Sequence, residues 1–250
     1  MNIKKTLLAG LAATLLISGV SKAGAEEDVG IFQLMECGKG EHCAIYRFPD
    51  LLADECINYH HIGVEYCLDN GIMNGTSDTT FSPQESLTRA QLATIFYRFA
   101  GSPAVSGGSP FADLTEDWYK TAVTWAASAG IVNGTSATTF SPYEPITNEQ
   151  LATIFYRYAK STGMDMSVPD PSRKYTCNED DPYSDYAYEA LVWCEERSIT
   201  SLGDDWSGNG IVIQNAGKPV TRFDTSYYFY GLFTVLGGSY SPVYQSEETE

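Results

Sequence analysis

The sequence predicts a mainly α fold built from helix–loop–helix repeats, with short irregular or β segments between the helices. An identical octapeptide, QLATIFYR, occupies residues 91–98 and again residues 150–157, a shift of 59. The stretch Asn-Gly-Thr-Ser at 74–77 returns with the same shift at 133–136. Apolar residues inside each repeat recur at helical spacing. Because eight identical residues in register do not arise by chance, we expect a tandem repeat.

The first helix of each repeat is predicted from an apolar face. In the second copy an aromatic residue, Trp118, is followed by Ala122, Val123 and Trp125 at spacings that share one side of a helix. The first copy has the same residue types at these positions. A third, more divergent copy has them after a shift of 68 residues. These counterparts are Tyr59, Gly63, Val64 and Tyr66 in the first copy, and Tyr186, Ala190, Leu191 and Trp193 in the third.

The second helix of each repeat is predicted from its start signal. Thr88 and Gln91 have the spacing of a capping box, in which each residue satisfies a backbone N–H of the first turn. Thr147 and Gln150 repeat the signal, and Thr221 retains the N-cap residue in the third copy. We expect the aromatic residues behind these caps to fill a central bundle.

The chain is therefore divided into six segments. They are a signal peptide at 1–25, an N-terminal segment with a small Cys loop at 26–47, repeats at 48–101, 110–160 and 172–237, and an acidic tail at 238–250. The third repeat is degenerate and contains an insertion at 204–217.

The first 25 residues have the organisation of a secretory signal. Lys4 and Lys5 precede the apolar stretch Leu7–Val20, and Ala23-Gly24-Ala25 supplies small residues for cleavage. The apolar stretch is shorter than the ~20 residues that a spanning helix needs. We expect a secreted protein without membrane insertion after cleavage, with a retained anchor as the alternative.

Composition excludes several classes of function. The chain has 15 Lys+Arg and 32 Asp+Glu, so loss of the three lysines of the signal gives (15 − 3) − 32 = −20. A protein this acidic is not expected to bind nucleic acid. Its 43% hydrophobic content indicates a folded chain. An anionic ligand would require a local cationic site.

Six cysteines in a secreted chain indicate disulfides, although six allow 15 pairings. The absence of Cys-x-x-Cys argues against zinc. The repeat alignment places Cys67 and Cys194 at the position of Ala126. Equivalent positions suggest equivalent partners, and the alternative is that both are reduced core residues replacing alanine. The predicted disulfides are Cys56–Cys67, Cys177–Cys194 and, from the remaining residues, Cys37–Cys43.

The combined motifs resemble the S-layer homology domain. The residues that carry the resemblance are Phe111-Ala112-Asp113, Trp118-Tyr119, Ala122-Val123, Gly130-Ile131-x-x-Gly134, Phe140-x-Pro142 and Leu87-Thr88-Arg89-Ala90-Gln91. The resemblance implies three copies packed as a pseudo-threefold spindle around a central helical bundle. It also implies a non-catalytic, cofactor-free protein of the cell wall or cell surface that binds an acidic, pyruvylated wall polysaccharide between copies. A protein partner or a surface-layer lattice is a further partner class.

The resemblance also implies a set of ligand-binding residues. They are Arg89, Arg222, Trp118, Gly71, Gly75, Gly130, Gly134 and Gln91. The residue chemistry supports Arg89 independently, because a cation at the first position of a helix opposes the macrodipole unless an anion binds there. For that reason we expect Arg89→Ala to change the stability of the fold little.

Departures from the motif limit the number of working sites. Asn148 stands where Arg89 stands in the first copy, so we expect the second copy to lack its cation. The third copy has Ser198 and Leu202 in place of the two loop glycines. At most two functional grooves are expected.

An enzyme is the alternative class. The sequence has no Gly-x-Ser-x-Gly, His-Glu-x-x-His or phosphate loop. A pair of carboxylates such as Asp113 and Glu116 would suit a secreted glycan hydrolase built on the repeat scaffold.

Overall fold

The computed structural model describes residues 47–52, 61–168, 170–177, 179–204 and 211–240. The chain divides into two units, Met1–Glu36 and Cys37–Glu250, and all described residues belong to the second. The predicted signal peptide, the Cys37–Cys43 loop and most of the acidic tail lie outside the described residues. No helix in the described ranges combines the length and apolar character needed to cross a membrane.

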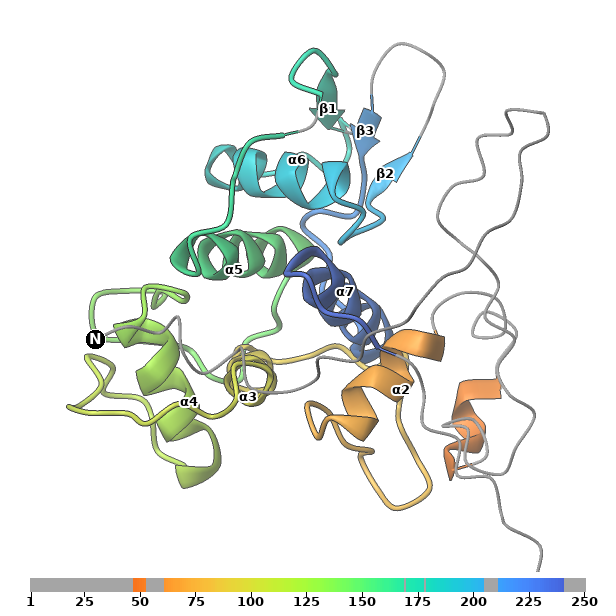
Figure 1. The fold of residues 1–250 in the computed structure, drawn as a ribbon. Helices are drawn as coiled ribbons and strands as arrows, with labels where there is room; N and C mark the ends of the chain where they lie inside the picture. Colours follow the sequence, from red (N-terminus) through yellow and green to blue (C-terminus); the bar gives the residue numbers. More distant parts are fainter. Residues whose placement is uncertain (1–46, 53–60, 169, 178, 205–210, 241–250) are drawn as a thin grey trace, which may run out of the picture. The chain divides into compact units, whose positions relative to one another are not determined.

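In the part of the chain that the structure describes, six α-helices form three consecutive pairs (Figure 1), which confirms the mainly α prediction. The first pair is α2 (His61–Asp69) and α3 (Arg89–Phe99), the second is α4 (Asp117–Ser128) and α5 (Asn148–Ser161), and the third is α6 (Tyr188–Glu196) and α7 (Arg222–Val235). The short 3-10 helices η2 (Pro49–Leu52) and η3 (Asp185–Ala187) precede α2 and α6.

A small three-stranded sheet accompanies the third pair. Its order is β1 (Tyr175–Cys177), β3 (Ile211–Ile213) and β2 (Gly203–Asp204). The pairing of β1 with β3 is parallel, and that of β2 with β3 is antiparallel. The predicted insertion therefore contributes β3, the central strand.

The second helix of each pair begins at its predicted cap. Thr88 Oγ1 accepts a hydrogen bond from the backbone N of Gln91 at 3.3 Å, and Gln91 Oε1 accepts one from the N of Thr88 at 2.8 Å. Thr147 and Gln150 form the same reciprocal pair. Thr221 Oγ1 accepts from the N of Asp224 at 3.1 Å. The capping boxes predicted at Thr88 and Thr147 are confirmed.

The first helix of each pair ends in one backbone pattern. Gly71 and Gly130 follow α2 and α4 with φ of +62° and +70°, and Ser198 follows α6 with φ of +53°. This left-handed conformation terminates a helix and is least costly for glycine. The next residue in each case donates to a carbonyl five positions earlier: Ile72 N to Cys67 O, Ile131 N to Ala126 O, and Ile199 N to Cys194 O.

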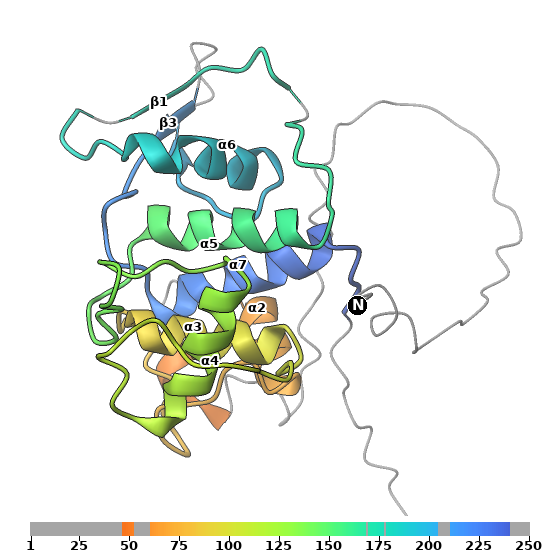
Figure 2. The same ribbon diagram turned by 90° about the vertical axis from the view of Figure 1, so that its left-hand side faces the viewer.

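The helices contact one another in a cycle across the pairs. Each first helix packs on the second helix of another pair: α4 on α3, α6 on α5, and α2 on α7. Figure 1 shows the three contacts, and Figure 2 shows α6 lying along α5 from a second direction. Backbone hydrogen bonds follow a cycle too, from Leu87 N to Val220 O, from Val220 N to Ile146 O, and from Ile146 N to Leu87 O.

Three phenylalanines meet where α3, α5 and α7 converge. The ring of Phe96 lies 5.5 Å from that of Phe155 and 5.1 Å from that of Phe229, and the last two are 5.0 Å apart. All three side chains are fully buried. The prediction that aromatic residues behind the helix caps fill a central bundle is confirmed for these three buried rings.

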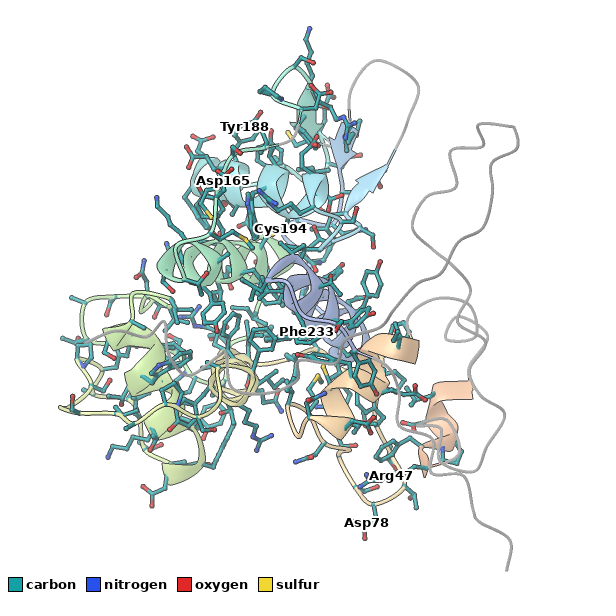
Figure 3. The ribbon with its side chains drawn as sticks, viewed as in Figure 1. Arg47, Asp78, Asp165, Tyr188, Cys194 and Phe233 are labelled. Carbon is teal, nitrogen blue, oxygen red and sulfur yellow. The ribbon has the colours of Figure 1, made fainter. Side chains whose placement is uncertain are left out.

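The structure contradicts the predicted disulfides at Cys67 and Cys194. Cys67, Cys177 and Cys194 are free thiols. Cys67 Sγ donates to the carbonyl of Ser226 on α7 at 3.7 Å, and Cys194 Sγ to the carbonyl of Ala152 on α5 at 3.8 Å. Figure 3 marks Cys194 where α6 faces α5. Both thiols lie in the buried helix contact that Ala126 occupies in α4, so they are reduced core residues, as the alternative held.

Gly63 allows α2 to approach α7 closely, and a larger residue should separate them. A Cβ at position 63 would lie 2.7 Å from Tyr227 Cα and 2.8 Å from Tyr227 N. Gly63→Ala gains about 1 kcal/mol of helix propensity, but a clash with backbone costs typically ~1–3 kcal/mol. We expect a lower urea midpoint. Ala122→Gly in α4 is the matched control, and a stabilised Gly63→Ala protein would contradict the packing argument.

Candidate functional site

Arg89 joins the start of α3 to the loop of the second pair. Its Nε donates to the carbonyl of Phe140 at 2.8 Å, and its Nη2 donates to the carbonyl of Asn133 at 2.7 Å. The guanidinium carbon lies 4.6 Å from the centre of the Phe140 ring. We call this place the Arg89 junction. Hydrogen bonds from a charged donor are stronger than bonds between neutral groups. The contact therefore fixes the first helix pair against the loop of the second pair.

Asp113 holds the loop that Arg89 contacts. Its carboxylate accepts hydrogen bonds from the backbone N of Phe140 at 2.8 Å and of Ser141 at 2.7 Å. Burial by itself would raise the pKa of Asp113, but these backbone donors, with Arg89 nearby, lower it below its ordinary value. The Asp113 carboxylate of the Phe111-Ala112-Asp113 stretch therefore holds the loop in position.

The glycines of the predicted site shape these loops. A Cβ at Gly134 would lie 2.4 Å from the carbonyl oxygens of Ser136 and Thr139 and 2.5 Å from the Phe111 ring. Gly75 is enclosed in the same way in the first pair. Together with Gly71 and Gly130 at helix ends, they have evident structural roles. Ligand contact by any of the four stays a prediction.

Arg222 makes the equivalent Arg222 junction with the loop of the first pair. Its Nε donates to the carbonyl of Phe81 at 2.7 Å and its Nη2 to that of Asn74 at 2.6 Å. The side chain is 8% exposed, less than that of Arg89. Asp50 accepts from the backbone N of Phe81 and Ser82, as Asp113 does in the second pair.

These contacts correct the assignment of each arginine to its own copy. Arg89 contacts the loop of the second pair, so that loop keeps a cation although Asn148 replaces an arginine. Arg222 contacts the complete loop of the first pair and not the altered loop of the third. The repeat pattern could not reveal this because the partner is chosen by packing between pairs.

The third junction, at Asn148, has a different charge arrangement. Asn148 Nδ2 donates to the carbonyls of Asn215 at 2.9 Å and Lys218 at 3.3 Å. The backbone N of Asn148 also donates to Lys218 O, as Arg89 N donates to Glu144 O and Arg222 N to Glu85 O. The helix start has lost its cation, and the loop has lysine where the other two loops have glutamate.

Glu149, beside Asn148, binds the start of the third pair. Its carboxylate accepts from Ser184 N at 2.7 Å, Ser184 Oγ at 2.9 Å and Tyr186 Oη at 3.0 Å. The other two junctions have Ala90 and Phe223 at this helix position. At the Asn148 junction an internal carboxylate therefore occupies the helix N-terminus, which favours negative charge.

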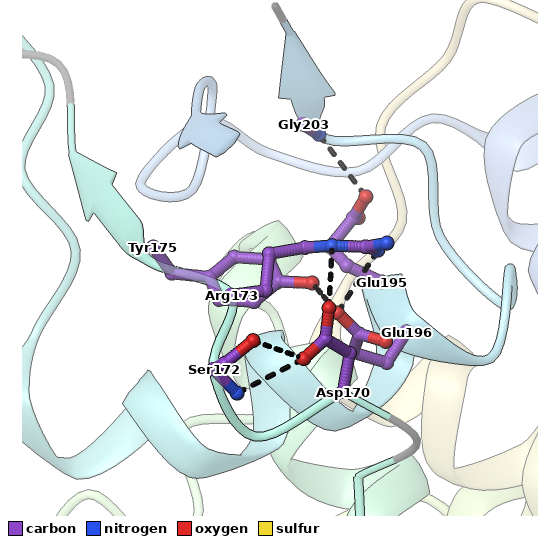
Figure 4. A network of polar contacts seen from close by, with 7 residues as sticks. All are labelled: Asp170, Ser172, Arg173, Tyr175, Glu195, Glu196 and Gly203. Atoms are coloured by element: carbon purple, nitrogen blue, oxygen red, sulfur yellow. Dashed lines mark hydrogen bonds and ion pairs between the residues drawn. The ribbon is translucent and has the colours of Figure 1, made fainter. Parts of the chain in front are cut away.

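Carboxylates also stabilise the altered loop of the third pair (Figure 4). Glu195 accepts hydrogen bonds from the backbone N of Leu202 at 2.8 Å and from Thr200 Oγ1. It also accepts one from the backbone N of Gly203 at 3.2 Å, which Figure 4 shows. Burial raises the pKa of Glu195, and these donors oppose the rise. The neighbouring Glu196 pairs with Arg173 at 3.0 Å. These contacts hold the loop without the Gly-Ile-x-x-Gly pattern.

Trp118 and Gln91 complete the predicted set. Trp118 is 49% exposed on the first turn of α4, and its Nε1 donates to Glu116 Oε2 at 2.7 Å. Gln91 uses its Oε1 in the helix cap. The structure thus brings Arg89 and the loop around Gly134 together, while Arg222, Gly71 and Gly75 belong to the other arginine junction. Sequence reasoning did not find Tyr143 or Glu149, because neither belongs to the repeated motif.

Two segments of the chain match a known protein family. Residues 58–93 and 110–152 match the S-layer homology domain. These S-layer homology segments include α2, the start of α3, all of α4 and the loop of the Arg89 junction. The matched ranges end before residues 172–237, so a third copy there stays a prediction.

Proteins of bacterial surfaces are among the similar sequences. The S-layer protein sap of Bacillus anthracis is 26% identical over 240 residues, 90% of this chain and 25% of that protein. The surface-layer 125 kDa protein of Lysinibacillus sphaericus is 30% identical over 116 residues, 44% of this chain and 10% of that protein. An endoglucanase of Bacillus sp. strain KSM-635 is 37% identical over 120 residues, 48% of this chain and 12% of that protein. The chain thus spans a quarter or less of these relatives.

Asn148→Arg tests the altered charges of the third junction. Asn148 is 6% exposed, and a new guanidinium would lie beside the backbone of Lys218, which holds the place of Glu144 and Glu85 at the other two junctions. We expect the single variant to be less stable than wild type and to bind no additional polymer. Adding Lys218→Glu should recover stability, because it recreates the Arg–Glu combination of the other junctions. Urea unfolding and calorimetric stoichiometry measure both effects, with Lys218→Glu alone as control. A stable single variant with an extra binding site would contradict this.

Proposed function

We propose that this chain is a non-catalytic, cell-surface protein that binds an acidic, pyruvylated secondary cell-wall polysaccharide and so anchors itself or a partner to the envelope. The observation that carries the proposal is the Arg89 junction. There a cation at a helix start is fixed against a loop, inside two S-layer homology segments of an otherwise acidic chain. The names of the surface-layer relatives support the cell-surface location.

The chemistry of the junction suits an acidic substituent. Nε and Nη2 of Arg89 are engaged by carbonyls, and Nη1 donates to no residue in the described ranges. A guanidinium donor that is already oriented binds a carboxylate at a lower entropic cost. Local charge of this kind would overcome the repulsion between a net-negative protein and a negative polymer.

We further propose that the three helix pairs are three copies of the domain, with bounds 48–101, 110–160 and 172–237, arranged as a pseudo-threefold spindle. The cycle of helix contacts, the cycle of backbone bonds and the shared helix ends support this arrangement. On this proposal the Arg89 and Arg222 junctions are the two sites for polymer, and the Asn148 junction is structural.

A glycan hydrolase is disfavoured by the carboxylates themselves. The pKa of Asp113 is lowered by backbone donors, and the pKa of Glu116 is lowered by hydrogen bonds from Tyr143 and Trp118. A glycosidase needs one carboxyl whose pKa is raised, so that it stays protonated and acts as a general acid. Neither member of the predicted pair meets that need.

Co-sedimentation tests the proposal. Purified protein is incubated with sacculi that retain their polysaccharide and with sacculi stripped by acid. We expect the protein to pellet with the first and remain soluble with the second. Equal pelleting with both would overturn the proposal, and release of reducing sugar from intact sacculi would favour the hydrolase.

A further inference from the structure

Two exposed aromatic side chains near the Arg89 junction are tied to one carboxylate. Large apolar side chains that stay exposed in the described residues are few: Trp118, Tyr143, Tyr186 and Tyr188. Trp118 is 49% and Tyr143 is 54% exposed. Glu116 Oε2 accepts a hydrogen bond from Trp118 Nε1 at 2.7 Å, and Glu116 Oε1 accepts one from Tyr143 Oη.

The buried ring of Tyr119 packs against the two exposed rings, those of Trp118 and Tyr143. Tyr119 is fully buried, and its ring meets those of Trp118 and Tyr143 edge-on, at centroid distances of 4.8 Å and 6.1 Å. The backbone N of Thr115 donates to Tyr119 Oη at 3.3 Å. The two exposed rings are therefore held before any ligand arrives, which removes part of the entropic cost of binding. We call Glu116, Trp118, Tyr119 and Tyr143 the aromatic platform.

The platform adjoins the Arg89 junction through the chain itself. Tyr143 lies between Pro142, whose carbonyl accepts from Ala90 N at 2.9 Å, and Glu144, whose carbonyl accepts from Arg89 N at 2.9 Å. The loop that contacts the start of α3 at Arg89 thus also carries Tyr143 of the platform. A polymer with an acidic group at Arg89 would bring a neighbouring sugar over this loop.

We propose that the aromatic platform binds a neutral pyranose of the wall polysaccharide, next to an acidic group bound by Arg89. This inference rests on the proposed function. The apolar face of a pyranose buries its C–H groups against aromatic rings. An ionised carboxylate is an acceptor only, with about four lone-pair sites, of which Trp118 and Tyr143 use two. Glu116 can accept from sugar hydroxyls and repels a carboxylate, so the sugar stacked here is uncharged.

The arrangement is a feature of the second copy. Gln84 stands 59 residues before Tyr143, at the equivalent place in the first copy. Ser184, 68 residues after Glu116, stands at its place in the third. Trp118, predicted above as a ligand-binding residue, is thus joined by Glu116 and Tyr143, two residues outside the repeated motif. Hydrogen bonds from Tyr143 and Trp118 lower the pKa of Glu116, so the acceptor remains ionised in mildly acidic surroundings.

Calorimetric titration with two polymers tests the platform. The probes are soluble pyruvylated wall polysaccharide and the same polymer after acid removal of its ketals. We expect Tyr143→Ala to weaken binding of both by about tenfold. Glu116→Gln should weaken both less, without changing the melting temperature. Arg89→Met should weaken only the acidic polymer. Gln84→Ala, the matched change in the first copy, should bind both like wild type.

The outcomes separate this inference from the proposed function. If the wild type binds and both Tyr143→Ala and Glu116→Gln bind with the same affinity, the platform proposal is overturned. The anchoring proposal would still stand. A wild-type protein that binds neither polymer would overturn both. If Tyr143→Ala instead abolishes self-association in sedimentation and leaves polymer binding intact, the surface is a contact between copies of the chain, and the platform proposal fails.

Discussion

Phe229→Ala is expected to lower the free energy of unfolding by about 3–5 kcal/mol, the usual cost of removing a buried phenylalanine ring. The ring of Phe229 lies 5.0–5.1 Å from those of Phe96, Phe99 and Phe155. Its loss would leave a cavity where α3, α5 and α7 meet, and the facing rings come from two helices, α3 and α5, that cannot both move fully inward. Urea unfolding followed by circular dichroism measures the change.

Phe233→Ala is the matched control, one turn further along α7. That ring is only partly buried and stacks at 4.5 Å on Tyr66, so we expect a smaller loss. The Phe96→Ala and Phe229→Ala changes should be non-additive when combined, because both line the same cavity. A loss below about 1 kcal/mol for Phe229→Ala would show that the three rings do not form a shared core.

Replacing the junction arginines should affect stability and binding differently. Arg222→Met leaves two carbonyls without a donor in a buried place, at a cost of about 1–3 kcal/mol for each. Arg89 is more exposed, so water can reach its carbonyls after Arg89→Met and the loss of stability should be smaller. The expectation of almost no loss at Arg89, made from the helix dipole alone, is corrected by its two hydrogen bonds.

Binding should weaken in both arginine variants. Loss of a charge-assisted contact with an acidic group costs about 1.5–3 kcal/mol, which is more than tenfold in affinity. Arg98→Met, an exposed change in the last turn of α3, controls for net charge. Calorimetry with pyruvylated polymer at two salt concentrations measures the effect. If Arg89→Met binds like Arg98→Met, Arg89 serves the fold alone.

The starts of the second helices and the repeat alignment could be predicted from short-range patterns in the chain. Helix starts at Thr88 and Thr147 could be predicted because the capping residues and the backbone groups they satisfy lie within one turn. The equivalence of Cys67, Ala126 and Cys194 also followed from the repeat spacing. A small side chain is needed at this position of each first helix, because it packs against a neighbouring helix. These features depend on short separations that a repeat displays directly.

Which loop each junction arginine contacts depends on the packing of the helix pairs against one another. Arg89 bonds to carbonyls 44 and 51 residues away, and Arg222 to carbonyls 141 and 148 residues away. Because the first and second copies share an identical octapeptide, local pattern cannot choose between a copy's own loop and its neighbour's. Helix packing makes that choice, since each first helix buries its apolar face on another pair. The same packing leaves Cys67 and Cys194 as thiols, because both are enclosed between helices where alanine would fit.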